Sequence, residues 1–170
     1  SQFCYTFQYL AGKTTYLDTP VVPVAAFAAV DKNPLDCECE DKTPAIYSAN
    51  NGTDNGPWVP VSGNRQLRIV SVGKMDVVNP LYDPAATTAP ANQKTIQRDY
   101  GFGAQSTGSR VTLGNVALTI DNWSDGVITA TVPDTITATG QLMVMRGDNQ
   151  KQSVVGLTVH VGGPAPTRVN

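Results

Sequence analysis

The sequence has few charged residues, a single histidine and no long apolar run, and each shortage excludes a class of protein. Charged side chains make up 15% of the 170 residues, and the 12 Lys and Arg are scattered through a chain of net charge −2. Nucleic-acid binding needs clustered basic residues that contact phosphates, so we expect no nucleic-acid partner. No apolar run approaches the ~18 residues of a membrane helix, so we expect no membrane insertion.

The shortage of histidine also limits the chemistry that the chain can perform. His160 is the only histidine, and strand alternation places it opposite the apolar residues, in solvent. A type 1 copper site needs two His and a Cys, so a chain with one histidine does not supply its ligands. The sequence contains no Gly-x-Ser-x-Gly elbow for a poised serine and no Gly-Lys phosphate loop. We therefore predict a protein that is not an enzyme and binds no cofactor.

Cysteine is also scarce, and all three residues lie in the first quarter of the chain: Cys4, Cys37 and Cys39. Cys37 and Cys39 are two residues apart, so on a strand their thiols point the same way and do not bridge to each other. We predict one disulfide, from Cys4 to Cys37 or Cys39, with one thiol left over. Three reduced thiols are the alternative. A zinc site is less expected, because zinc takes about four ligands and three Cys with one distant His do not supply them.

Residues 100–163 contain a series of short segments in which apolar and polar residues alternate, separated by turn signals. Gly114-Asn115 and Asp125-Gly126 are turn signals, and apolar residues recur at every second position between them. This period places the apolar side chains on one face of each strand and predicts an all-β sandwich. No segment shows the 3.6-residue period of a helix. The apolar positions are Val111, Leu113, Val116, Leu118, Ile120, Ile128, Ala130, Val132, Leu142, Val144, Leu157, Val159 and Val161.

The domain organisation expected from these patterns has two parts and a tail. Residues 1–66 form a smaller, irregular β-rich module that holds the disulfide. Residues 67–163 form the sandwich, and residues 164–170 form a C-terminal tail. The stretch 79–92 is rich in Pro, Ala and Thr, which favours a loop over a helix.

Three motifs of the second part occur in the order seen in one known family. They are Tyr100-Gly101-Phe102-Gly103, the hairpin at residues 111–116, and a Trp-Ser-Asp that leads into the strand at residues 127–133. Together they resemble an IPT/TIG domain over residues 94–163, reaching back to Leu67. The resemblance implies an immunoglobulin-like sandwich, of the kind found in cell-surface receptors and as accessory modules of secreted bacterial enzymes.

An acidic stretch is the candidate metal site. Its five carboxylates lie within eleven residues, and Ca²⁺ takes six to eight oxygen ligands. The stretch lacks the alternating spacing and the glycine of an EF-hand, so a solvated acidic loop is favoured and calcium is the alternative. The five residues are Asp31, Asp36, Glu38, Glu40 and Asp41.

Two tryptophans and two glycosylation triplets are the remaining candidates. Trp123 stands where the resembled family buries an aromatic residue, which favours the core. Trp58 is equally consistent with packing and with an exposed platform for stacking sugars. Asn51-Gly52-Thr53 and Asn122-Trp123-Ser124 fit the N-glycosylation acceptor, and Asn51 lies in the more exposed turn.

The function predicted from the sequence is that of a non-catalytic module at the cell surface or outside the cell. It would act as a spacer, a self-assembling surface or filament subunit, or an accessory domain of a larger secreted protein. The expected partner is a protein, including another copy, bound through strand edges such as residues 1–10 and 163–170. One alternative is a carbohydrate-binding module that uses Trp58. The other is a fragment of a larger, copper oxidase-like enzyme whose active site lies outside this chain.

Overall fold

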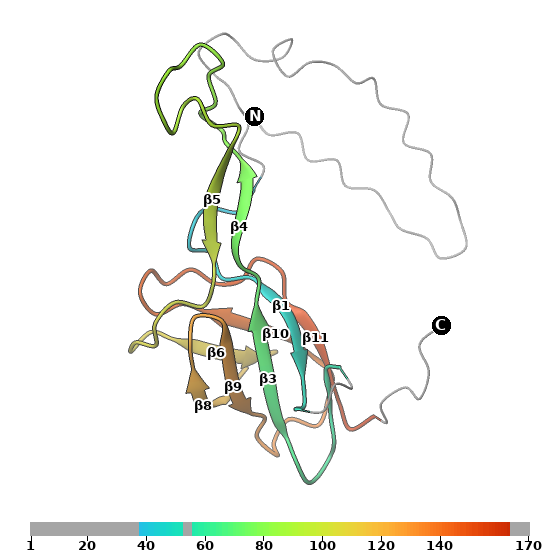
Figure 1. Cartoon of the computed structure of the whole chain (residues 1–170). Coiled ribbons are helices and arrows are strands. Elements are labelled where there is room, and N and C mark those ends of the chain that lie inside the picture. The colour runs from blue at the N-terminus through green and yellow to red at the C-terminus, as the bar shows by residue number, and fades with distance from the viewer. Residues whose placement is uncertain (1–37, 53–55, 164–170) are drawn as a thin grey trace, which may run out of the picture. The chain divides into compact units, whose positions relative to one another are not determined.

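The computed structural model describes residues 38–52 and 56–163, which contain strands and turns and no helix (Figure 1). The all-β prediction is confirmed. The chain divides into two compact units, residues 1–38 with 77–96 and residues 39–76 with 97–170. The strands are β1 (Ile46–Asn50), β2 (Trp58–Val59), β3 (Gln66–Ser71), β4 (Gly73–Val78), β5 (Thr95–Tyr100), β6 (Arg110–Leu113), β7 (Val116–Ala117), β8 (Thr119–Trp123), β9 (Val127–Thr131), β10 (Gly140–Met145) and β11 (Leu157–Val161).

The larger unit is a sandwich of two sheets. One sheet has the order β1-β3-β9-β8, and the other has the order β2-β11-β10-β6-β7. Neighbouring strands are antiparallel except β2, which runs parallel to β11. Both sheets contribute to one core, because the inward face of each strand is apolar. The core residues are Ala49, Val59, Leu67, Ile69, Phe102, Val111, Leu113, Leu118, Trp123, Ile128, Ala130, Val132, Ile136, Leu142, Val144, Val159 and Val161.

The alternation predicted for the central strands is present in the structure. Ile128 and Ala130 of β9 and Leu142 and Val144 of β10 are fully buried, and the residues between them are partly exposed. His160 of β11 is exposed between two buried valines, as expected. Burying a side chain of the Val or Leu class contributes roughly 1.5–3 kcal/mol, so these inward residues account for much of the fold's stability.

The alternation predicted through Val116, Leu118 and Ile120 is not one continuous strand. β7 pairs with β6 in one sheet, whereas β8 pairs with β9 in the other. The chain crosses between the sheets at Leu118, whose side chain is buried in the core and whose N–H donates to Val111 O at 2.9 Å. Val116 therefore lies outside the core and is 41% exposed.

The boundary expected between residues 66 and 67 lies elsewhere in the structure. β1 pairs with β3, and β2 pairs with β11, so strands from the expected first module are part of the sandwich. The larger unit begins at Cys39. The sequence did not show this, because only the pairing partner shows which sheet a short strand joins.

The described part of the smaller unit is Glu38 and residues 77–96, where the ends of β4 and β5, which pair as a two-stranded sheet, are joined by a loop organised by one buried asparagine. Asn79 Nδ2 donates to Pro90 O at 2.8 Å and to Gln93 O at 2.7 Å. Its Oδ1 accepts from Leu81 N at 3.0 Å. The Asn79 side chain thus adds to backbone hydrogen bonds such as Asn79 N to Lys94 O at 2.9 Å, and the loop predicted at residues 79–92 is confirmed. No helix in the described residues is long and apolar enough to cross a membrane.

Candidate functional site

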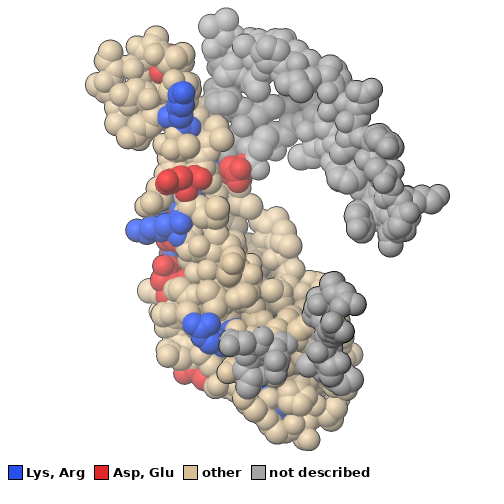
Figure 2. All heavy atoms as spheres, turned by 45° about the vertical axis from the view of Figure 1, so that its right-hand side comes forward, with Lys and Arg blue, Asp and Glu red and all other residues tan. Residues whose placement is uncertain are grey.

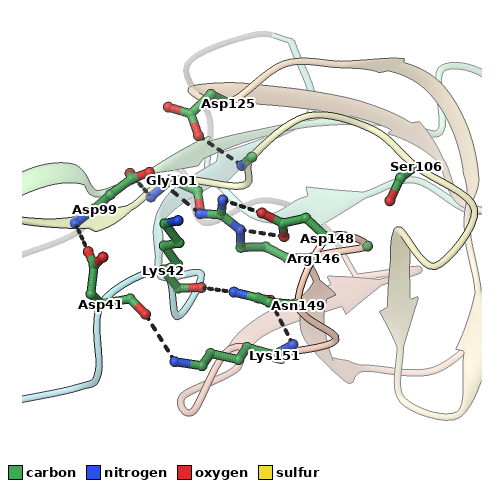
Figure 3. Close-up of polar contacts among 12 residues, drawn as sticks. Asp41, Lys42, Asp99, Gly101, Ser106, Asp125, Arg146, Asp148, Asn149 and Lys151 are labelled. Atoms are coloured by element: carbon green, nitrogen blue, oxygen red, sulfur yellow. Dashed lines mark hydrogen bonds and ion pairs between the residues drawn. The ribbon is translucent and has the colours of Figure 1, made fainter.

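A buried arginine holds together one end of the sandwich (Figure 3). Arg146 follows β10, and its guanidinium donates twice to Asp148, from Nε to Oδ1 at 3.0 Å and from Nη2 to Oδ2 at 2.9 Å. Nη1 donates to Gly101 O at 3.0 Å and lies 3.6 Å from Asp99 Oδ2. Such two-pronged pairs fix geometry as well as charge, so Arg146 positions the chain around Gly101.

The ion pair shifts the pKa of both partners. The hydrogen bonds from Arg146 hold the pKa of Asp148 below its ordinary value, against the opposing effect of burial. The same hydrogen bonds raise the pKa of Arg146. Because both shifts favour the charged forms, the pair is ionised throughout the neutral range and has no proton to give or take there.

The turn Gly101-Phe102-Gly103 is held from the other side by the end of β8. Asp125 accepts from Gly103 N with its carboxylate and from Phe102 N with its backbone oxygen, each at 2.8 Å. Trp123 Nε1 donates to Gly103 O at 2.9 Å. A side chain at Gly101 would overlap the Asp125 carboxylate, which explains the glycine. Trp123 lies in the core, as the sequence led us to expect.

A second buried arginine performs a similar structural task. Arg65 donates to five backbone oxygens at 2.6–3.1 Å, and its Nε lies 3.3 Å from the exposed Asp134 carboxylate. Among the described residues, no buried side-chain nitrogen or oxygen lacks a hydrogen-bond partner. The buried polar groups of the sandwich are therefore used to fix its loops.

The acidic stretch is partly visible in the structure. Glu40 pairs with Lys151 at 2.7 Å, and Asp41 Oδ1 accepts from Asp99 N at 2.7 Å. Glu38 is exposed, and Asp31 and Asp36 lie outside the described residues. Within the described ranges, no group of three His, Cys, Asp or Glu is arranged to hold a metal ion. Calcium binding by the whole stretch stays a prediction.

The cysteine prediction is visible only at one residue. Cys39 is exposed and its thiol is free. Cys4 and Cys37 lie outside the described residues. The disulfide from Cys4 to Cys37 or Cys39 therefore stays a prediction.

Trp58 of β2 is packed between His160 of β11 and the backbone at Gly56, which precedes β2. Its ring stacks on His160, with centroids 5.9 Å apart and planes 13° from parallel. A side chain at Gly56 would overlap the six-membered ring of Trp58, so that backbone also lies against the indole. Glycan binding stays a prediction. Asn51 is partly exposed, but Thr53 of its triplet lies outside the described residues.

The structure reveals one surface that sequence reasoning missed, which we call the open face. It consists of residues 43–47, at the start of β1, and residues 154–157, before and at the start of β11. A groove of about 270 Å³ runs between these segments, and most of its lining is apolar. Tyr47, Val154 and Val155 are 74%, 70% and 77% exposed. The adjacent valines before β11 were the only sequence signal.

Strand edges and an absence of charge distinguish the open face. β1 is the outermost strand of its sheet, and β2 faces only His160 and Val161 of β11, so no described strand covers the start of β11. Residues 43–52 and 152–159 contain no charged side chain. Figure 2 shows the side that lies to the right in Figure 1, and most of the Lys, Arg, Asp and Glu side chains visible there lie toward the left edge. Unpaired edges with exposed apolar neighbours are templates for association.

The opposite edge of the same sheet is protected. Asp121 lies in the middle of β8, where Oδ2 accepts from Gln66 Nε2 at 3.1 Å and from Thr131 Oγ1 at 2.8 Å. The pairing of β8 with β9 is irregular between Ile120 and Asn122. A charge and a bulge are two devices by which edge strands avoid pairing with other chains.

Comparison of the chain with protein-family models, curated proteins and solved structures found no match. The resemblance to IPT/TIG domains therefore stays a prediction. Function is inferred from the surfaces of the molecule, where the protected β8 edge and the open face differ most.

Proposed function

We propose that this protein is a non-catalytic, extracellular structural or interaction module of the IPT/TIG type, and that it binds protein through the open face. Its role would be that of an assembly subunit, a spacer or an accessory domain within a larger secreted assembly. The observation that carries this proposal is the combination, on one side of the sandwich, of an apolar groove with a sheet edge that no described strand covers.

Two physical arguments favour a protein as the ligand. Protein interfaces are depleted of charge at their centres, and the segments of the open face contain no charged side chain and one exposed aromatic residue, Tyr47. Tyr47, Val154 and Val155 expose apolar surface to water. A protein partner that covers this surface would gain free energy, because burying apolar area is favourable. A strand edge adds backbone hydrogen bonds, which supply affinity in strand-addition complexes.

The chemistry of the buried charges is consistent with this role. Arg65 and Arg146 are used to hold backbone oxygens and Asp148. Their contacts make the two sheets and their loops a rigid platform, which suits a surface that must keep its shape when it binds.

The test is the native mass of the protein in extracts of its own source. We expect the wild-type protein in an assembly larger than one chain, and a variant with both Val154→Lys and Val155→Lys at the mass of one chain. Val116→Lys is the matched control, since Val116 is an exposed valine on β7, at the far edge of the other sheet. A wild-type protein of monomeric mass, or an assembly that survives both charges, would contradict the proposal.

A further inference from the structure

We infer that Met143 is an oxidation site that controls the shape of the open face. Hydrogen peroxide would convert its thioether to the sulfoxide and so loosen the segment that carries Val154 and Val155. The sulfur bonds to one peroxide oxygen and loses two electrons, the O–O bond breaks, and the other oxygen leaves as water with both protons. Oxidation here would act on the chain itself, whether or not a partner binds the open face.

The two exposed valines of the open face stand in an interruption of the strand pairing. β10 pairs with β11 as far as Leu142 with Leu157. The pairing resumes at Val144, whose backbone oxygen accepts from Ser153 N at 2.8 Å. Between these two points β10 has one residue, Met143, and the facing segment has three. The extra residues are left out of the ladder, so the valines bulge outward and are 70% and 77% exposed.

Met143 contacts both ends of this bulge. Ser153 Oγ donates to Met143 Sδ at 3.8 Å and accepts from Val144 N at 3.1 Å. A Cβ atom at Gly156 would lie 2.6 Å from the same sulfur, so Met143 Sδ packs against the Gly156 backbone. One sulfur atom thus contacts the residue before the two valines and the residue after them.

The Met143 side chain is within reach of a small oxidant. It alternates along β10 with two buried residues, so it lies on the outer face of the five-stranded sheet, where it is partly exposed. A hollow of about 50 Å³ lies beside it, lined also by Arg110, Thr112, Met145 and Gln152. This volume holds a molecule the size of water, and hydrogen peroxide is only slightly larger.

Oxidation would remove the contacts that hold the bulge. A sulfoxide is polar and larger than a thioether, and it disrupts packed apolar contacts. The new oxygen has no room at Gly156, where even a Cβ atom would overlap the sulfur. We therefore expect the oxidised Met143 side chain to turn into solvent, which separates it from Ser153 and Gly156 and lets the valines move.

The experiment is amide hydrogen exchange of the purified full chain before and after peroxide treatment, with the oxidised positions located by peptide mass spectrometry. The chain has three methionines, Met75, Met143 and Met145. A variant with both Met75→Leu and Met145→Leu keeps Met143 alone. In this variant, oxidation is expected to speed exchange at the hydrogen-bonded amides of Val144 and Ser153 roughly threefold to tenfold, the effect of losing one hydrogen bond.

Met143→Leu is the matched control, because it keeps the apolar volume, the other two methionines and every cysteine. Peroxide is expected to leave exchange at the same two amides unchanged in this variant. Equal acceleration in Met143→Leu would overturn the inference, as would unchanged or slower exchange in the variant that keeps Met143. A Met143 that stays unoxidised in the wild-type chain while the exposed Met75 is fully converted would also overturn it.

This test is separate from that of the proposed function. Exchange is measured on the purified chain, so its result does not depend on a partner at the valines. The native mass of the variant with both Val154→Lys and Val155→Lys tests only the binding of a partner. A failure of one can therefore be told from a failure of the other.

Discussion

The two outer strands of the four-stranded sheet, β1 and β8, have the same length but opposite surroundings. β8 carries Asp121 at its centre, and its end is tied to the turn at Gly103 through Trp123. β1 has no charge, an exposed Tyr47 and an apolar groove beside it. The difference indicates that this sheet is closed against association on one side only.

The difference between the two edges affects how readily each one pairs with another chain. A free edge exposes a row of backbone donors and acceptors, and soluble proteins normally cover or charge it. Here only β8 of the two edge strands carries a charge, whereas both have an irregular pairing, β8 between Ile120 and Asn122 and β1 between Ile46 and Ser48. Of the two edges, the uncharged β1 edge is therefore the one at which we expect a partner to bind.

The largest effect is expected from loosening the hydrogen-bond network of Arg146, which follows β10. Arg146→Ala removes the hydrogen bonds to Asp148 and Gly101 O, and it leaves a void beside the buried turn. We expect the free energy of unfolding to fall by roughly 2–3 kcal/mol, the scale of hydrogen bonds to charged groups. Urea denaturation measures this. Arg110→Ala, on the exposed start of β6, should change stability by less than about 0.5 kcal/mol; an equal loss in both variants would contradict the structural role.

A smaller effect is expected from removing the charge on β8. Asp121→Ala deletes the acceptor used by Gln66 and Thr131, and we expect a loss of about 1 kcal/mol in unfolding free energy because the site is exposed. It also removes the charge that guards the edge, so light scattering should show oligomers that the wild-type chain does not form. Association as limited as that of wild type would show that Asp121 does not protect β8.

The pH dependence should show a weaker effect of Asp148. Its pKa is lowered by Arg146, so the stabilisation is present above the unfolded-state pKa near 3.8 and is lost as the pH falls through the lower folded-state value. Because the Asp148 side chain is 43% exposed, screening limits the contribution to less than about 1 kcal/mol. Asp148→Asn should unfold more easily in urea at pH 6, and this gap should close at pH 2. A gap that persists there would contradict the ion pair as its cause.

The smallest effect on stability is expected at the open face. Tyr47→Ala should change the unfolding free energy of the dilute protein by no more than about 0.5 kcal/mol, because the side chain is exposed in the single chain. The measurement is urea denaturation at low micromolar concentration. A large loss would mean that Tyr47 supports the fold and not a contact with another molecule.

Much of the fold follows from the sequence, since period two alone identified the inward residues of β9 and β10. The crossing at Leu118 did not follow, because two short strands and a continuous one have the same alternation. The membership of β1 and β2 in the sandwich was missed for a related reason. A strand of two to five residues carries too little pattern to specify its sheet, and pairing decides it.

The candidate surfaces were less predictable still. The Arg146 network joins Gly101 to a residue 45 positions later, and only the packed fold brings them together. The groove likewise needs two segments more than 100 residues apart in the chain. The predicted association through the chain ends, residues 1–10 and 163–170, stays a prediction, because all of these residues except Gly163 lie outside the described residues.

Amide hydrogen exchange of the full chain, compared between its native assembly and the dilute purified protein, tests the central claim most directly. If β1 is the edge that binds a partner, amides of residues 46–50 should exchange more slowly in the assembly, while those of β8 should not change. Slower exchange at β8, or no change at β1 in a sample shown by its mass to be an assembly, would contradict the account.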